Sequence, residues 1–214
     1  MPHSSRAYDR GMDYSGLSLA EVSAELRNVA RDARSTFGDL DEGQLNWHPG
    51  DAGWSVAQCF SHLFTGNRLV HRAAQDATER PAHSVWQRLP LLPRLFGKLL
   101  VRSQGPASKW KFTAPTRARP TGADIPRSII EQFASQQVDA AQWMETVDER
   151  HAARSIMISP FVRFVTYSVL DGCRLLAAHD RRHFEQARRV LLMREFPIPS
   201  EETGGRSDNG SRHT

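Results

Sequence analysis

The sequence has few cysteines, no long apolar run and no apolar leader. Cys59 and Cys173 are its only cysteines among 214 residues, so no disulfide framework holds the fold, and a reduced compartment is expected. No segment approaches the roughly 20 apolar residues that a membrane-spanning helix needs. The opening residues, MPHSSRAYDRGMDYSG, lack the apolar core of a secretory signal peptide. We therefore expect a soluble, cytoplasmic protein without a transmembrane segment.

Strong strand alternation, internal repeats and nucleic-acid-reading motifs are also missing, so we expect no specific binding of nucleic acid. Apolar residues make up 39% of the chain and charged residues 24%, which is typical of a globular protein. The formal net charge of +4 and the pI near 9.5 permit an acidic partner without requiring one. The length favours a single domain with a substantial core.

The sequence does contain four long segments with helical periodicity. The first begins at Ser18, whose Ser-x-x-Glu pattern with Glu21 predicts a capping box, and it ends at Gly38. The second begins at Ser55, with Gln58 three residues later in the same pattern. Each capping pattern predicts the residue at which its helix begins.

The third segment follows Asp124, which we expect to cap a helix that has Pro126 in its first turn. The fourth runs from about residue 169 to residue 194. Between them, SIMISPFVRFVTY is compatible with a short strand or an irregular lead-in, because Pro160 interrupts a regular element.

Four amphipathic helices can bury their apolar stripes only against one another, so the sequence predicts an all-α four-helix bundle with one long crossover. Residues 1–17 form an N-terminal extension and residues 18–196 the bundle domain. Residues 197–214 are polar and rich in turn formers, so we expect a disordered tail.

The crossover is strongly basic. Residues 81–123 contain eight lysines or arginines and no acidic residue. Its composition is compatible with three roles, namely contact with a membrane surface, binding of an acidic substrate, or covering of a cleft. We favour a fourth interpretation, in which its apolar residues pack on the bundle and its charges face water, because charge runs usually form solvated faces.

Two histidines interrupt the apolar stripe of the fourth helix. His179 and His183 are four residues apart and therefore share one face, whereas Arg181 and Arg182 are expected to point to the other side. A buried imidazole without a partner costs a few kcal/mol, and either a hydrogen bond in the core or a divalent metal ion removes that cost. His62, on the flank of the second helix, is the candidate third ligand, and three imidazoles would leave positions for water or substrate.

Other assignments for these residues are weaker. HDRRH has Asp180 where the zincin motif has its glutamate, and no third ligand follows it. Asp180 either orients an imidazole or is a solvated or helix-pairing carboxylate, and we favour the latter. Cys59, one turn before His62, is interpreted as a small buried hydrophobe. His48 lies in a turn-like connector and is left out of the ligand set.

Two stretches, WHPGDAGWSVAQCFSHL and HDRRHFEQARRV, resemble the DinB-like superfamily of bacterial proteins. The shared pattern is Trp-Ser near the start of the second helix, a following His-Leu, and His-x-x-x-His in the last helix. The resemblance spans roughly residues 18–195. It implies an up-down-down-up four-helix bundle in which His62, His179 and His183 are the metal-binding triad. Known members bind nickel, zinc or similar ions and often form homodimers.

Some members of that superfamily transfer low-molecular-weight thiols, and others are called hydrolases. The resemblance therefore implies one divalent ion, zinc or nickel, that activates a thiol or water against a small-molecule substrate. We favour a thiol-dependent S-transferase, with a low-molecular-weight thiol as co-substrate. A metal-dependent hydrolase and a non-catalytic metal-binding stress or interaction protein remain as alternatives. No residue is identified as a general base.

Overall fold

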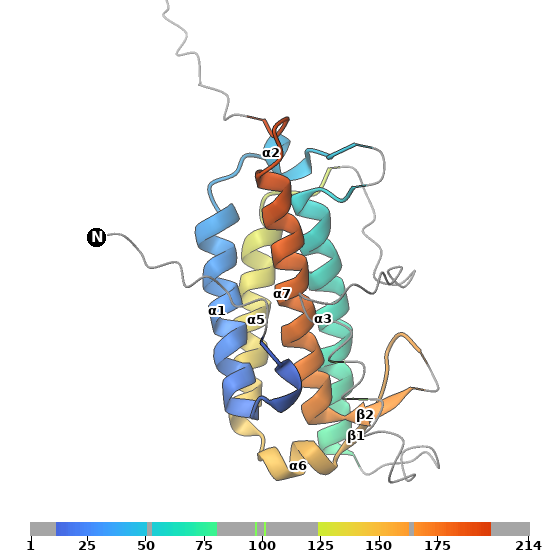
Figure 1. Cartoon of the computed structure of the whole chain (residues 1–214). Coiled ribbons are helices and arrows are strands. Elements are labelled where there is room, and N and C mark those ends of the chain that lie inside the picture. Colours follow the sequence, from blue (N-terminus) through green and yellow to red (C-terminus); the bar gives the residue numbers. More distant parts are fainter. Residues whose placement is uncertain are drawn as a thin grey trace, which may run out of the picture.

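The computed structural model describes residues 12–50, 53–80, 97, 101, 124–162 and 165–197. Four long helices lie side by side in it (Figure 1), namely α1 (Leu19–Phe37), α3 (Val56–Glu79), α5 (Ile129–Thr146) and α7 (Val169–Leu191). The short elements are η1 (Tyr14–Gly16), α2 (Glu42–Asn46), α6 (Glu149–Arg154), β1 (Ile156–Ile158) and β2 (Thr166–Ser168). The all-α prediction is confirmed. Apart from residue 197, the expected C-terminal tail lies outside the described residues.

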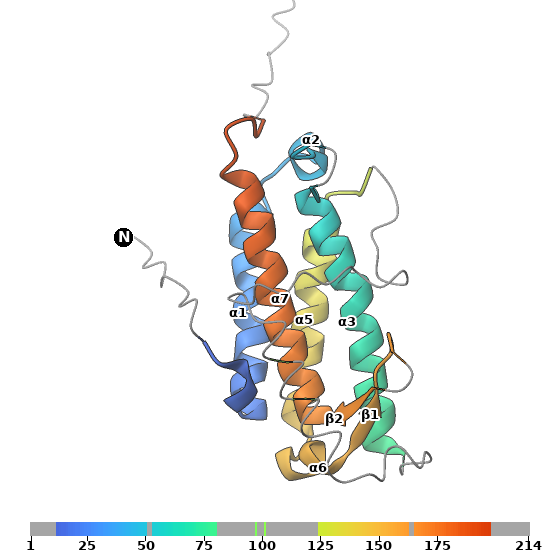
Figure 2. The same ribbon diagram turned by 45° about the vertical axis from the view of Figure 1, so that its right-hand side comes forward.

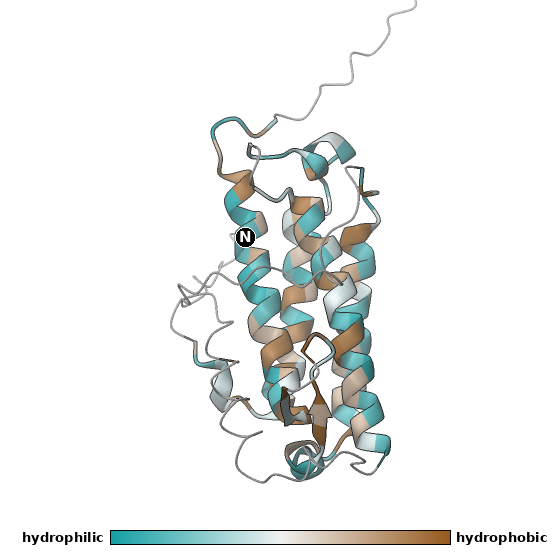
Figure 3. Cartoon of the chain, turned by 90° about the vertical axis from the view of Figure 1, so that its right-hand side faces the viewer, coloured by the Kyte–Doolittle hydropathy of each residue, from teal (hydrophilic) through white to brown (hydrophobic). Residues whose placement is uncertain are grey.

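The helices follow the predicted up-down-down-up order. In the view of Figure 1, α1 and α7 run upward and α3 and α5 run downward, and a turned view agrees (Figure 2). Helix α1 packs against α5 and α7, and α3 packs against the same two helices. Figure 3 shows hydrophobic residues where the long helices face one another and hydrophilic residues over much of their outer surface. The antiparallel pair α3 and α7 carries all three candidate ligands.

Local capping fixes where α1 and α3 begin. The hydroxyl of Ser18 accepts a hydrogen bond from the backbone of Glu21, whose carboxylate accepts one from the backbone of Ser18. Ser55 and Gln58 form the same reciprocal pair at the start of α3. Both predicted capping boxes are therefore confirmed, and Gly38 is the C-cap of α1 as expected. Such caps contribute typically about 1 kcal/mol each.

Two predicted helix boundaries were wrong, the start of α5 and the end of α7. Helix α5 begins at Ile129 after Ser128, and Asp124 does not cap it. A turn, in which the backbone N–H of Ile129 donates to the carbonyl of Pro126 (3.0 Å), precedes the helix and delays its start. Helix α7 begins at the expected Val169 but ends at Leu191, before the predicted end.

Short elements fill the connectors. Helix α2 lies in the polar segment between α1 and α3, and its own capping box joins Asp41 and Gln44. Helix α6 is capped by Asp148, whose side chain accepts from the backbone of His151. β1 and β2 pair antiparallel, with Met157 opposite Tyr167, so the segment before α7 contains a short hairpin. No helix among the described residues has the length and apolarity needed to cross a bilayer.

One phenylalanine from each long helix meets the others in the core near the candidate ligands. The ring centroid of Phe37 lies 5.0 Å from that of Phe60 and 5.4 Å from that of Phe184, and Phe60 lies 5.1 Å from Phe133. Edge-to-face pairs of this kind contribute about 0.5–1.5 kcal/mol beyond their buried area. The cluster fixes α3 and α7 through their common contact with Phe37.

The basic crossover is described at only two positions. Val101 is 1% exposed and lies in a core cluster. Gly97 approaches α7 so closely that an added Cβ would lie 2.6 Å from a carboxylate oxygen of Asp171. Buried contacts at these two positions agree with packing of the segment on the bundle, and the rest of residues 81–123 lies outside the described residues.

Candidate metal centre

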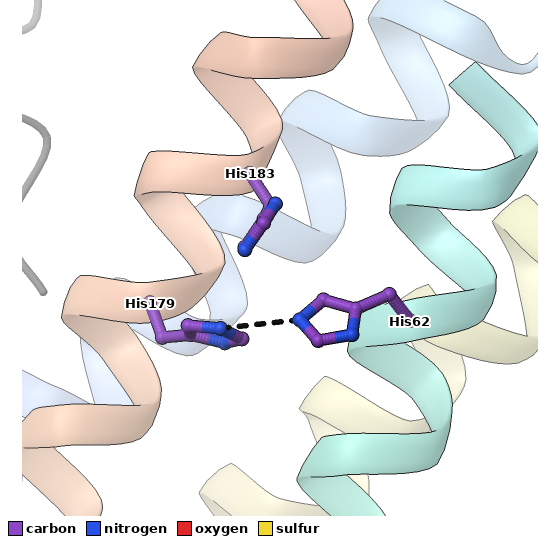
Figure 4. Close-up of side chains that lie close together, drawn as sticks. All are labelled: His62, His179 and His183. Atoms are coloured by element: carbon purple, nitrogen blue, oxygen red, sulfur yellow. Dashed lines mark hydrogen bonds between the residues drawn. The ribbon is translucent and has the colours of Figure 1, made fainter. Parts of the chain in front are cut away.

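The three predicted ligands meet between α3 and α7. Figure 4 shows the ring of His62, from α3, pointing toward the rings of His179 and His183, from α7. The ring centroids lie 5.1 Å apart for His62 and His179, 4.7 Å for His62 and His183, and 4.6 Å for His179 and His183. One nitrogen from each ring lies within 4.8 Å of the other two. The three residues that the sequence predicted as metal ligands therefore lie together in the structure.

Their surroundings shield the three rings from much of the solvent. His62 is 4% exposed, and the other two histidines are half-buried. The Nδ1 atom of His183 is buried and has no hydrogen-bond partner among the described residues. A buried polar nitrogen without a partner costs roughly 1–3 kcal/mol. Figure 4 shows that the His183 nitrogen pointing toward the other two rings is the one farther from the backbone of α7, Nε2, so this cost lies outside the centre of the triad.

Electrostatics keep the α7 histidines neutral. Desolvation, followed by the neighbouring histidines and Arg182, holds the pKa of His179 well below its usual range. Desolvation, with His62 and Arg182 as further causes, lowers the pKa of His183 to about 3. At neutral pH both rings therefore present a lone pair without losing a proton first. A neutral imidazole is the form that coordinates a metal ion.

One distance at the centre matches tetrahedral coordination. The Nε2 atoms of His62 and His179 lie 3.3 Å apart. A zinc ion bound about 2.0–2.1 Å from each imidazole nitrogen separates neighbouring ligand atoms by about 3.3–3.4 Å in a tetrahedron. A hydrogen bond between the two rings fits the same distance. The donor set fits a divalent ion.

Trp54 is part of the centre, which the sequence did not indicate. Its ring is stacked on that of His183, with centroids 5.7 Å apart and planes 16° apart. It also meets the ring of His62 edge-on at 5.0 Å. In the sequence it was recognised only as part of the Trp-Ser pattern near the start of the second helix. Trp54 precedes Ser55, the N-cap of α3, and is not itself helical. It was therefore not part of the helical pattern from which we predicted contacts.

Asp180 is buried, so its interpretation as a solvated carboxylate was wrong. Its side chain is 0% exposed and accepts a hydrogen bond from Nδ2 of Asn67 on α3 at 2.7 Å. The helix-pairing alternative holds, because this bond joins α7 to α3. Desolvation raises the pKa of Asp180 well above its usual range.

Arg181 points away from the triad, but into the protein. It is 1% exposed, and its guanidinium donates to Glu25 at 3.0 Å and to Asp32 at 2.8 Å, both on α1. The prediction that Arg181 points away from the apolar stripe assumed that α7 has a single buried face. Helix α7 packs against both α1 and α3, so residues on two flanks are buried.

The remaining described histidines and the nearby cysteine do not join the triad. His48 Nδ1 lies 3.2 Å from the carbonyl of Gly53, and His71 packs on Trp143 with ring centroids 5.0 Å apart. Burial raises the pKa of the Cys59 thiol to about 12, and the side chain lies in the apolar core as expected. In the described part of the chain, the triad is the only group of at least three potential metal ligands.

Comparison with known proteins gave one positive result. The family model described as the DinB superfamily matches residues 25–187, a span that covers most of the chain and includes all three histidines. No curated protein and no solved structure matched the chain. The match is consistent with the bundle and the histidine group described above.

Proposed function

The chain belongs to the DinB superfamily, and from this premise we propose that His62, His179 and His183 bind one divalent metal ion in a small-molecule enzyme. The convergence of three ring nitrogens within 4.8 Å, from two separate helices, carries this proposal. Three imidazoles suit zinc or nickel, although copper and iron accept the same donors.

We propose a thiol-dependent S-transferase as the reaction type. A divalent ion with an open coordination position lowers the pKa of a bound thiol or water and so supplies a nucleophile near neutral pH. The chain's own contribution is to hold the three imidazoles in place, to keep those of His179 and His183 neutral, and to shield the rings from part of the solvent. Trp54 covers His183 and one edge of His62, so a substrate must approach from a side that the indole leaves open.

The remaining elements of the proposal come from the family resemblance and the composition. A low-molecular-weight thiol as co-substrate and a homodimeric assembly are proposed because relatives of this kind have them. A cytoplasmic location is proposed because both cysteines are free and buried, which suits a reducing compartment.

Metal content is the first test. Purified protein is expected to hold one zinc or nickel per chain, and the single variants His62→Ala, His179→Ala and His183→Ala are expected to lose it. The His71→Ala variant is the matched control, because His71 lies on α3 outside the triad. A wild-type protein that remains folded and binds neither ion would refute the proposed metal site.

The reaction type needs a second test with the metal-loaded protein. A transferase should couple cysteine, or another small thiol, to a chromogenic aryl halide, and the rate should require both thiol and metal. Thiol-independent cleavage of a nitrophenyl ester would instead support a metal-dependent hydrolase. Full metal occupancy without either activity would favour a non-catalytic metal-binding protein.

A further inference from the structure

A buried polar contact joins the two helices that carry the triad. Nδ2 of Asn67, on α3, donates to Oδ1 of Asp180, on α7, at 2.7 Å. Asn67 is 3% exposed and Asp180 is 0% exposed. Asp180 directly follows His179, and Asn67 lies five residues after His62 on the same helix. The bond is therefore about 1.4 turns of α3 away from the ligand on that helix.

We propose that Asn67 and Asp180 are positioning residues for the metal centre, and that their hydrogen bond sets the spacing and register of α3 against α7. This inference rests on the proposed metal site. The three imidazoles converge only if the two helices keep one relative position. Apolar side chains alone tolerate small shifts along such an interface, whereas a buried hydrogen bond requires one distance and direction.

A second buried contact fixes the rotation of the same part of α7. Arg181, next to Asp180, donates to Glu25 and Asp32 on α1. Consecutive residues of α7 are therefore held to two different neighbouring helices, Asp180 to α3 and Arg181 to α1. Rotation of α7 about its axis would break both contacts. The directions in which His179 and His183 point are consequently determined by residues that are not ligands.

The location of the Asn67–Asp180 bond supports a role beyond stability. Replacement of a buried polar pair by apolar residues of similar size is often neutral for stability, because no polar group is left without a partner. Buried polar groups are best attested as devices that select one register. Groups hydrogen-bonded directly to metal ligands typically change metal affinity by 10- to 100-fold when they are removed, whereas Asn67 and Asp180 act on the ligands through the positions of α3 and α7.

The test is titration of metal-stripped protein with zinc. The double variant Asn67→Leu/Asp180→Leu is expected to bind zinc about 10-fold more weakly, the lower end of the range for direct partners of metal ligands, with a far-ultraviolet circular dichroism spectrum like that of the wild type. The Asp180→Asn variant keeps an oxygen that accepts from Asn67 and should stay within about threefold of wild type. The double variant Arg27→Ala/Glu145→Ala is the matched control, because it removes an interhelical pair between α1 and α5.

The visible spectrum of the cobalt(II)-loaded protein adds a readout of ligand geometry. We expect the Asn67→Leu/Asp180→Leu variant to lose absorption intensity typical of tetrahedral cobalt, whereas a role in stability alone would leave the spectrum unchanged. If that variant fails to fold, Asn67→Ala, which removes only the donor, should show the same loss of affinity.

The outcomes separate this inference from the proposed metal site. Wild-type protein that fails to bind zinc or nickel refutes the metal site itself. Wild-type binding together with unchanged affinity and cobalt spectrum in the Asn67→Leu/Asp180→Leu variant overturns only the positioning role. An Asp180→Asn variant as weak as the double variant would also overturn it, because charge rather than the hydrogen bond would then control affinity.

Discussion

The indole of Trp54 is stacked on the imidazole of His183, with the two ring planes 16° apart. Because a paramagnetic ion at the triad would lie close to this indole, nickel(II) or cobalt(II) should quench its fluorescence. The chain has five tryptophans, so we expect a partial quench that saturates at one ion per chain. Trp54→Phe should remove most of the quench, whereas Trp143→Phe should keep it.

Metal binding should stabilise the folded chain. A ligand present at 100 times its dissociation constant, and bound only by the folded state, adds about 2.7 kcal/mol to the free energy of unfolding. For a domain of this size we expect a rise in melting temperature of roughly 5–10 °C. Differential scanning calorimetry with zinc and with chelator checks this. His183→Ala should abolish the rise, and the exposed loop variant His48→Ala should retain it.

The metal-free protein should lose stability as the pH falls below neutral. In the unfolded chain histidines titrate near pH 6.5, whereas burial lowers the pKa of His183 to about 3 and that of His179 well below its usual range. Below pH 6.5 the unfolded state therefore binds protons that the folded state does not. The free energy of unfolding should fall by up to about 1.4 kcal/mol per histidine for each pH unit.

Urea unfolding at pH 7 and pH 5, in the presence of chelator, measures this loss. The double variant His179→Gln/His183→Gln keeps polar side chains but cannot take up these protons. Its stability should change less between the two pH values than that of the wild type. If the free energy of unfolding changed equally in the wild type and the double variant, proton uptake by His179 and His183 would not be the cause. All other titrating groups are the same in both proteins.

The buried pair between Arg181 and Glu25 should be costly to break. Arg181→Met removes the guanidinium that donates to Glu25, which is 4% exposed, and breaking a buried pair in this way typically costs about 3–5 kcal/mol. Removing Glu25 as well, in Arg181→Met/Glu25→Leu, should restore most of the loss. Arg34→Ala, which breaks an exposed pair with Glu131, should cost less than about 1 kcal/mol in the same urea experiment.

Local signals explain how much of the fold was predictable. The starts of α1 and α3 follow from capping boxes within four consecutive residues, so no tertiary information was needed. The triad followed from helical spacing together with the expectation that apolar stripes face one core. Helix α2 was missed although Asp41 and Gln44 carry the same capping pattern, because the connector has no apolar stripe.

The contacts that were missed depend on how helices surround one another. Asp180 and Arg181 look like surface residues when a single stripe defines the buried face. Helix α7 has neighbours on two sides, so both side chains are buried in different interfaces. The late start of α5 has a local cause instead, because the turn between Pro126 and Ile129 replaces the cap expected at Asp124.

The pairing of α3 with α7 also has a consequence for synthesis of the chain. His62 and His179 are 117 positions apart, and α5 is made between them. A ribosome therefore adds 117 residues between the synthesis of His62 and that of His179. One ion can be shared by all three histidines only after His183 has been synthesised and α7 has packed against α3.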